Sequence, residues 1–285
     1  MSIDKKIKKS SFAKATQPSP TAMAGRQADR QVETEEKQPG MTLSKYIAHA
    51  GICSRRKVEQ LVAQGLITIN GTVVTNIACR VQPGDEVRVY GNIVEPVEDM
   101  VYILLNKPND CITTTSDDIG RRTVMDLLGD ISERVYPVGR LDRKTTGLLL
   151  FTNDGALAEQ LSHPRYEIRK TYHVVLDKPV HEDDIEKLST GVYLPDGMVA
   201  VDDIMYVPKQ QKKEVLVTVH SGKYRVVRRM FEALNYEVVK LDRVEFAGLT
   251  KKGLSVSILM HVHRENHHSL LFLHPFLQSF SDDNR

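Results

Sequence analysis

The sequence predicts an α+β protein with two small folded domains, and three observations carry that prediction. A length of 285 residues is enough for two domains that each bury a core. A helical pattern and a small group of short strands occupy residues 41–98. From residue 99 to residue 258, β-rich runs mix with helical patterns without strict alternation, which favours a mixed, mainly antiparallel sheet over a doubly wound parallel one.

Composition excludes several classes of protein. Hydrophobic residues make up 41% and charged residues 27%, a balance that is not collagen-like, fully disordered or typical of a disulfide scaffold. The net charge of +2 provides no general attraction to nucleic acid, so such binding must come from local basic patches. No run approaches the roughly 20 apolar residues of a membrane helix. The three cysteines, Cys53, Cys79 and Cys111, are far apart in the sequence. This spacing argues against a structural zinc site and indicates reduced thiols, as in a cytoplasmic protein.

Residues 1–40 are predicted to form a disordered basic arm. The segment carries lysines early and then mainly Ser, Ala, Thr, Gln and Pro, so it cannot bury enough apolar surface to offset its ordering entropy. The scarcity of acidic residues before Asp29 also permits an organellar import signal as a second interpretation.

The next segment, residues 41–98, predicts two short helices followed by small strands. Apolar residues recur at helical spacing, Gly51 ends the first helix, and Ser54 caps the second. Asn70-Gly71 is a hairpin signal. The basic triplet Arg55–Lys57 at the start of the second helix opposes the helix dipole, so it is either a solvated face or a phosphate-binding one.

One candidate for chemistry remains after the common catalytic motifs are searched. The motifs GxGxxG, GxxxxGK[ST], GxSxG and HExxH are all absent from the sequence. The run Gly139 to Gly147 places Asp142 between Arg140 and Arg143, directly before an apolar strand. A carboxylate kept ionised in a constrained loop suits a nucleophile or a base, and the alternative is a structural ion pair.

Two groups of motifs resemble known families. SKYIAHAGICSRRKVEQLVAQGLITINGTVV, followed by PGDEVRV, resembles the S4-like (alpha-L) RNA-binding module. This resemblance implies that Lys45, Arg55, Arg56 and Lys57 contact structured RNA. YPVGRLDRKTTGLLLFTNDG, with NKP upstream and RKTYHV and HSGKYRVVRRMFEALNYEVVKLDRV downstream, resembles the RsuA/RluB-type ribosomal RNA pseudouridine synthases. Together the motifs span about residues 41–252.

The second resemblance implies a role for each matching residue. Asp142 is the catalytic carboxylate, Tyr172 packs on the target base, and Arg228 pairs with the aspartate. Leu241 and Arg140 line the base pocket. Contacts to the RNA around a flipped-out nucleotide are expected from Arg165, Lys170, Lys223 and Arg229, with Arg169 and Arg225 as further candidates. No metal ion or cofactor is expected.

The implied reaction detaches uracil from the sugar, turns it, and rejoins it through a ring carbon. A carboxylate starts this either by attacking the anomeric carbon or by removing a sugar proton, and the sequence leaves both routes open. The segment TTTSDDIGRRTVMDLL favours large-subunit (23S) ribosomal RNA as substrate. We expect a monomer in a bacterial-type cytoplasm, with ribosomal RNA or an assembly intermediate as partner and no membrane association.

The similarity ends near residue 252, and this end suggests an alternative function. Residues 259–285 form an atypical His- and Phe-rich tail, and the chain has no Trp. We expect this change to leave a sheet edge unpaired and to expose Leu270, Leu271, Phe272, Phe276 and Phe280. The alternative is therefore a weakened or inactive ribosomal RNA-binding assembly factor. A glycosidase-like hydrolase is a poorer third hypothesis because no second acid is evident.

Overall fold

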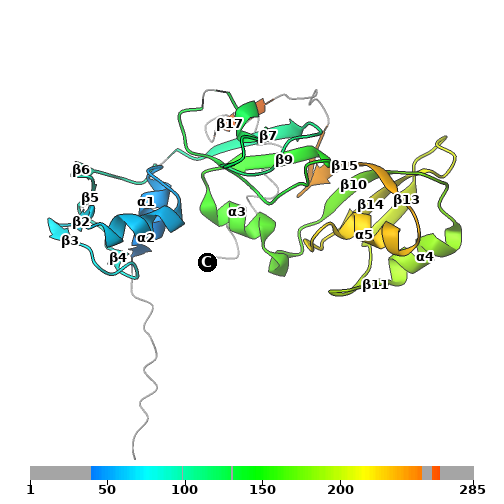
Figure 1. Cartoon of the computed structure of the whole chain (residues 1–285), viewed down its shortest axis with the longest axis horizontal. Coiled ribbons are helices and arrows are strands. Elements are labelled where there is room, and N and C mark those ends of the chain that lie inside the picture. Colours follow the sequence, from blue (N-terminus) through cyan, green and yellow to red (C-terminus); the bar gives the residue numbers. More distant parts are fainter. Residues whose placement is uncertain (1–39, 98, 130, 252–258, 264–285) are drawn as a thin grey trace, which may run out of the picture. The chain divides into compact units, whose positions relative to one another are not determined.

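The structure is a computed structural model that describes residues 40–97, 99–129 and 131–251 and the backbone of strand 259–263 (Figure 1). The basic arm predicted for residues 1–40 and the apolar tail residues 270–280 lie outside this part, apart from Gly40. No helix in the described ranges has the length and apolar character needed to cross a membrane.

The N-terminal module contains the two predicted helices and two small sheets. Helices α1 (Leu43–His49) and α2 (Arg55–Ala63) pack through residues such as Leu43, Val58 and Leu61. The Ser54 hydroxyl accepts a hydrogen bond from the Lys57 backbone N–H at 3.3 Å, which caps α2 as predicted. The strands are β1 (Met41–Thr42), which pairs with β4 (Arg80–Val81), and the ordered set β3 (Thr72–Val73), β2 (Ile67–Ile69), β5 (Val87–Val89) and β6 (Asn92–Ile93).

A nine-stranded mixed sheet forms the centre of the second part of the chain, which confirms the predicted α+β class (Figure 1). Its pairings are antiparallel except that β9 and β15 run parallel, with Arg243 opposite Gly147. The order is β13 (Asp203–Tyr206), β14 (Glu214–Val219), β10 (Lys170–Leu176), β15 (Val238–Phe246), β9 (Thr146–Thr152), β7 (Val101–Lys107) and β17 (Leu259–His263), with β8 (Tyr136–Pro137) on β9 and β16 (Leu249–Thr250) on β15.

Both faces of the central strands are covered. All seven residues of β7 are buried, and β9 sends Leu148 and Leu150 to one core cluster and Leu149 and Phe151 to another. Helix α3 (Gly155–Ser162) packs on the first of these clusters, and the Asp154 side chain caps it. The continuous apolar pattern of these strands is therefore explained by burial on two sides.

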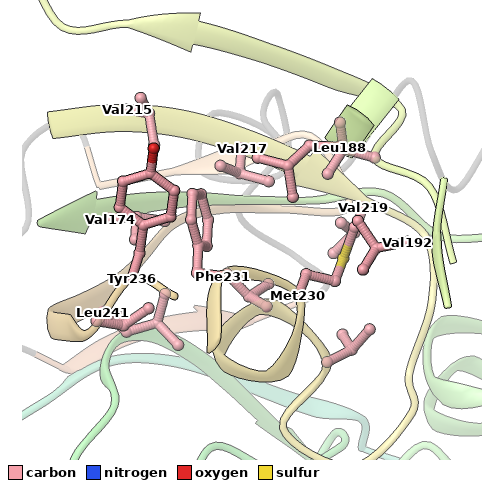
Figure 2. Packing of buried hydrophobic residues seen from close by; sticks show 14 of the residues in the cluster. Val174, Leu188, Val192, Val215, Val217, Val219, Met230, Phe231, Tyr236 and Leu241 are labelled. Atoms are coloured by element: carbon pink, nitrogen blue, oxygen red, sulfur yellow. The ribbon is translucent and has the colours of Figure 1, made fainter. Parts of the chain in front are cut away.

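The other half of the sheet is covered by α5 (Val226–Ala233). Phe231 of α5 lies near Val174 of β10 and Val217 of β14, and the Met230 side chain extends toward Val192 and Val219 of the same cluster (Figure 2). Phe231 meets Tyr236 edge to face, with ring centroids 6.3 Å apart. This packing holds α5 against the part of the sheet formed by β10 and β14.

Three parts of the fold differ from or extend the expectations. Strand β17 pairs with β7 in register, Leu259 opposite Leu105 and His263 opposite Val101. The sheet therefore includes a strand beyond residue 258, the expected end of the catalytic domain, and β7 is not its outermost described strand. The hairpin β11 (Val192–Leu194) and β12 (Gly197–Val199) and the strand β13 were not predicted. Helix α4 (Glu182–Thr190) and short 3-10 turns at Met125–Leu127 and Pro164–Tyr166 complete the elements.

Candidate active site

A cavity of about 170 Å³ is lined by two of the three predicted catalytic residues, Asp142 and Tyr172, and by residues of four separate segments, whereas Arg228 is not among its lining residues. The loop before β9 contributes Asp142, β10 contributes Tyr172, the start of α5 with its preceding loop contributes Arg225, and β15 contributes Leu241. Arg140, Lys170 and Lys223 also line this cavity. The structure thus brings together residues that are far apart in the chain.

The Asp142 loop is held by a buried lysine at the end of β7. The Lys107 side chain is 1% exposed, and its ammonium donates to the carbonyl oxygens of Pro108, Arg143 and Thr145 at 3.0, 3.2 and 2.8 Å. Burial lowers the pKa of Lys107 to about 8, and the nearby Asp142 carboxylate acts in the opposite direction. Because the carbonyls of Arg143 and Thr145 closely follow Asp142 in the chain, Lys107 holds the loop directly after the carboxylate.

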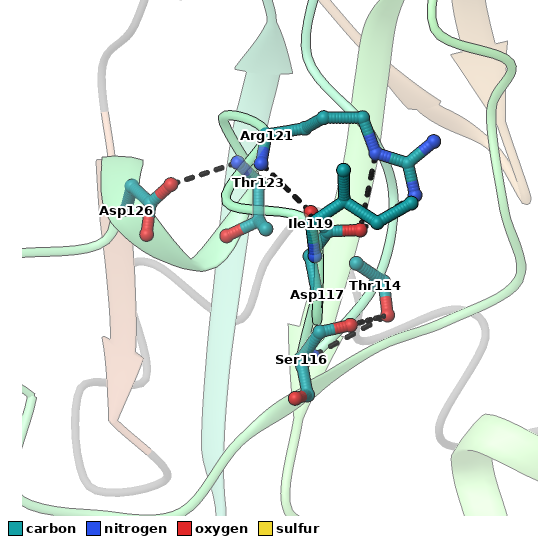
Figure 3. A network of polar contacts seen from close by, with 7 residues as sticks. All are labelled: Thr114, Ser116, Asp117, Ile119, Arg121, Thr123 and Asp126. Carbon is teal, nitrogen blue, oxygen red and sulfur yellow. Dashed lines mark hydrogen bonds and ion pairs between the residues drawn. The ribbon is translucent and has the colours of Figure 1, made fainter.

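A second connection joins this loop to the segment after β7. The Thr113 hydroxyl donates to the Leu141 carbonyl at 2.8 Å and accepts from the Leu141 N–H at 3.3 Å. The segment beyond Thr113 is folded around Asp117, whose carboxylate accepts from the backbone N–H groups of Ile119 and Arg121 and from the Arg121 guanidinium (Figure 3). These contacts lower the pKa of Asp117 to about 2. Asp117 therefore organises this loop through its carboxylate.

The partner of Asp142 is not the residue that we expected. The Asp142 carboxylate, on a side chain that is 33% exposed, lies 3.7 Å from the Arg225 guanidinium. Arg143, its neighbour in sequence, pairs with Asp110 at 2.5 Å instead. An ion pair with a residue across the cavity holds the carboxylate in place while leaving part of it accessible.

Arg228 is close to this pair but is bonded elsewhere. Its side chain is 7% exposed, and one guanidinium N–H donates to the Val238 carbonyl at 2.7 Å. Burial lowers the pKa of Arg228, the Arg225 charge lowers it further, and the Asp142 carboxylate raises it. The expected pairing of Arg228 with Asp142 is therefore replaced, within the described residues, by the Arg225 ion pair, and Arg228 acts on the carboxylate through its charge.

Tyr172 and Leu241 lie on neighbouring strands at the same cavity. Tyr172 faces Arg243 in the β10–β15 pairing, next to a register shift between Thr171 and Tyr172. Leu241 and Arg243 are two residues apart on β15, so their side chains point to the same face of the sheet. The cavity beside the Asp142 carboxylate is therefore bordered by an aromatic ring, an aliphatic side chain and the Arg243 guanidinium.

The predicted RNA-contacting cations fall into two groups. Lys45, Arg55, Arg56 and Lys57 are exposed on α1 and on the first turn of α2. In the second part of the chain, Arg229 is bonded to the Asp196 carboxylate, Lys223 donates to the Asp196 carbonyl at 2.8 Å, and Arg165 donates to the Tyr166 hydroxyl at 2.5 Å. Lys170 donates to the carbonyls of Ile168 and His220, both at 2.8 Å. An RNA phosphate at Arg229 would thus compete with an internal carboxylate.

Three residues that matter to the cavity had no assigned catalytic role in the sequence. Lys107 is a charged residue at the end of an otherwise mainly apolar strand, which is a signal of a buried functional charge. Arg243 stands in phase with the apolar Leu241, which is a similar signal. Arg225 was assigned only to RNA contacts. In the part of the chain that the structure describes, no three His, Cys, Asp or Glu side chains are grouped so as to hold a metal ion.

Comparisons with known proteins agree with this geometry. The RNA pseudouridylate synthase family matches residues 101–233, and the S4 domain matches residues 41–87. "Ribosomal large subunit pseudouridine synthase B" of Bacillus subtilis is 44% identical over 215 residues, which cover 74% of this chain and 88% of that protein. "Dual-specificity RNA pseudouridine synthase RluF" of Escherichia coli K12 is 37% identical, with 74% of this chain and 72% of that protein covered. A solved structure of a pseudouridylate synthase matches with a TM-score of 0.55 and 26% identity, covering 78% of this chain and 96% of that one.

Proposed function

The chain belongs to the RNA pseudouridylate synthases with an S4 domain, and we propose that it isomerises a uridine of large-subunit ribosomal RNA to pseudouridine with Asp142 as the catalytic carboxylate. The observation that carries the proposal is the shared cavity of Asp142, Tyr172 and Leu241, with Arg225 in contact with the carboxylate. The similarity to a large-subunit synthase over most of both chains supports the substrate.

Each residue of the cavity has a separate proposed role in the reaction. Asp142 lies where a sugar enters the cavity, and Arg225 holds it there. Tyr172 and Leu241 enclose the base, so the base stays in the site when its bond to the sugar breaks. Arg228 and Arg140 add positive charge near the carboxylate. Binding alone needs no such grouping, so the inactive alternative has no observation in its favour.

RNA binding is assigned to two surfaces. The exposed cations Lys45, Arg55, Arg56 and Lys57 of the S4 domain bind the folded RNA, and Lys170, Lys223, Arg165 and Arg229 serve the RNA around the target nucleotide. We further assign the protein to the bacterial cytoplasm as a monomer, in keeping with the bacterial relatives.

Loss of tritium from carbon 5 of uridine tests the proposed function. Pseudouridine forms when carbon 5 takes the place of nitrogen 1 on the sugar, and the hydrogen on carbon 5 is then released to water. Large-subunit ribosomal RNA of Bacillus subtilis, transcribed with 5-tritiated uridine, is expected to release about one tritium per molecule for each modified site. No release above that from small-subunit RNA would contradict the proposed substrate.

Replacing Arg55, Arg56 and Lys57 with Gln is expected to weaken RNA binding and to flatten its salt dependence. Each phosphate contact contributes about 0.7 to 0.9 to the slope of log affinity against log salt, so the loss of three contacts lowers the slope by about 2 to 3. Filter binding between 50 and 300 mM salt measures this slope. Replacing three exposed lysines of another region, Lys178, Lys187 and Lys212, is the matched control. An unchanged slope in the first variant removes α2 from the interface.

Lys170 makes RNA affinity depend on pH in a defined direction. Burial, and then the charge of Arg243, lower the pKa of Lys170 to about 8. A lysine is charged below its pKa, so its attraction for phosphate is present at pH 7 and is lost as the pH rises through about 8. Between pH 7 and 9 the RNA affinity of the wild type should fall about fivefold more than that of Lys170→Arg, because arginine stays charged over this range. The factor corresponds to roughly 1 kcal/mol for one charged contact. Parallel affinity curves for the two proteins would remove Lys170 from the interface.

A further inference from the structure

Arg243 is a buried cation at the end of the cavity where the base is proposed to bind. Its side chain is 3% exposed and lines the cavity that contains Asp142. It faces Tyr172 across the β10–β15 pairing and lies on the same face of β15 as Leu241. The guanidinium therefore borders the two side chains that enclose the base.

The contacts of Arg243 leave its charge unbalanced. Its Nε donates to the Leu148 carbonyl at 2.7 Å, and its guanidinium carbon lies 4.4 Å from the centre of the Phe246 ring. Nη2 is buried without a hydrogen-bond partner. Among the described residues no carboxylate forms an ion pair with it, because the adjacent Asp242 binds Lys251 and Thr146 instead.

Such a group is costly to keep. A buried charge with no opposite charge beside it destabilises a protein, and buried polar atoms without hydrogen bonds are rare in native proteins. Burial lowers the pKa of the Arg243 guanidinium, and the facing Tyr172 side chain, by charge and by a hydrogen bond, acts in the opposite direction. Lys170 lines the same cavity, so a second cation adds to the positive potential. The positive potential at this end of the cavity favours the binding of a negatively charged group.

The proposed reaction creates a negative charge at this end. When the bond between C1′ of the sugar and N1 of uracil breaks, its electron pair goes to N1, and the charge spreads over N1 and the two carbonyl oxygens of the base. We propose that Arg243 stabilises the detached uracil as an anion and holds Tyr172 against it. The inference rests on the proposed function and adds to it a catalytic residue that acts on the base directly.

The step balances without any further reactant. The electron pair that leaves with N1 is used again when C5 of the turned base forms its bond to C1′. C5 then loses its proton and N1 takes one up, so the base is neutral at the end. Arg243 keeps its own protons throughout, because an arginine stays charged even when its pKa is lowered by burial. Arg243 therefore contributes a fixed positive charge that stabilises the uracil anion, and this stabilisation is strongest in a site that excludes water.

The test compares Arg243→Met and Arg243→Lys with the wild type on two RNAs that differ in one atom. One carries uridine at the modified position, and the other carries 5-fluorouridine, whose fluorine withdraws electrons and makes the leaving base less basic. The rate at which the target nucleotide is consumed is measured in single turnover by nucleoside chromatography, and RNA affinity is measured separately. Thermal unfolding of each variant checks that it is folded, and Arg88→Met, at an exposed ion pair, is the control.

Arg243→Met should slow the consumption of uridine by about 100-fold or more, the usual effect of removing one preorganised charge-stabilising group. On 5-fluorouridine the same variant should lose about tenfold or less, because a less basic leaving group needs less help. Arg243→Lys should recover part of the rate, since it keeps the charge and loses the fork of N–H groups. RNA affinity should stay within about threefold throughout.

Equal defects on the two RNAs from a folded Arg243→Met variant would overturn the inference, because a structural role has no dependence on the leaving group. A loss of RNA affinity that equals the loss in rate would overturn it as well. If the wild type converted neither RNA, the proposed function would fail and this inference with it. An active wild type with leaving-group-independent defects would contradict the role of Arg243 alone.

Discussion

Asp142→Ala is expected to abolish the conversion of uridine, lowering the single-turnover rate by at least about 10³-fold while RNA affinity stays within about threefold. The carboxylate is the acidic group lining the cavity beside Tyr172 and Leu241, and both routes open to the reaction begin at it. Its side chain makes few contacts besides the Arg225 ion pair at 3.7 Å, so its loss should disturb RNA binding little. Tritium release from carbon 5 and filter binding measure the two quantities.

Asp142→Asn is the matched variant, because it keeps the shape and removes the charge. It should be as inactive as Asp142→Ala. Asp110→Ala is the control, since Asp110 is an exposed carboxylate paired with Arg143 at the end of the same loop. Product formation by Asp142→Ala within tenfold of the wild type would contradict the assigned role.

Gly147→Ala is expected to lower the free energy of unfolding by about 3 kcal/mol or more and to remove activity with it. Gly147 has φ +109°, and a Cβ atom there would overlap the Arg243 carbonyl oxygen and lie 2.6 Å from the Arg243 nitrogen. The left-handed backbone costs a side chain about 1–2 kcal/mol and overpacking about 1–3 kcal/mol. The neighbour is backbone of β15, which cannot move without breaking the parallel pairing that places the Asp142 loop beside Leu241.

Gly139→Ala separates the two causes of this effect. Gly139 also has positive φ, +71°, but nothing lies within 4 Å of its Cβ position. Gly139→Ala should lower the free energy of unfolding by about 1 kcal/mol, the cost of the left-handed backbone without any steric overlap. Equal stability of the two variants in urea unfolding would show that β15 yields to the methyl group and that the close approach at Gly147 is not required.

Much of the fold follows from periodicity and turn residues. Continuous apolar runs mark the strands at residues 101–107 and 146–152, and apolar residues at helical spacing mark α3, α4 and α5. Of these helices, α3 also has a capping side chain, that of Asp154. The hairpin β11–β12 was missed because its strands are three residues long, too short for a period-2 signal. Strand β17 was not predicted because its partner β7 is distant in the sequence, so no local sequence pattern indicates the pairing.

The candidate site was predictable in its composition and less so in its pairings. Asp142 stood out because a carboxylate between two arginines, bracketed by glycines, precedes a buried strand. Proximity in sequence then suggested Arg140 and Arg143 as its partners, and the resemblance suggested Arg228. The structure shows Arg225, because the left-handed backbone of Arg225 before α5, at φ +46°, is a tertiary feature that residue identities do not reveal. The burial of Lys107 and Arg243 is likewise decided by strand order.

The most direct test of the central claim maps pseudouridine in ribosomal RNA by carbodiimide modification and reverse transcription. The RNA comes from cells that lack the gene, and from the same cells complemented with the wild type or with Asp142→Ala. One stop in large-subunit RNA should vanish on deletion and return only with the wild type. A stop that also returns with Asp142→Ala, or a pattern that the deletion leaves unchanged, would contradict the account.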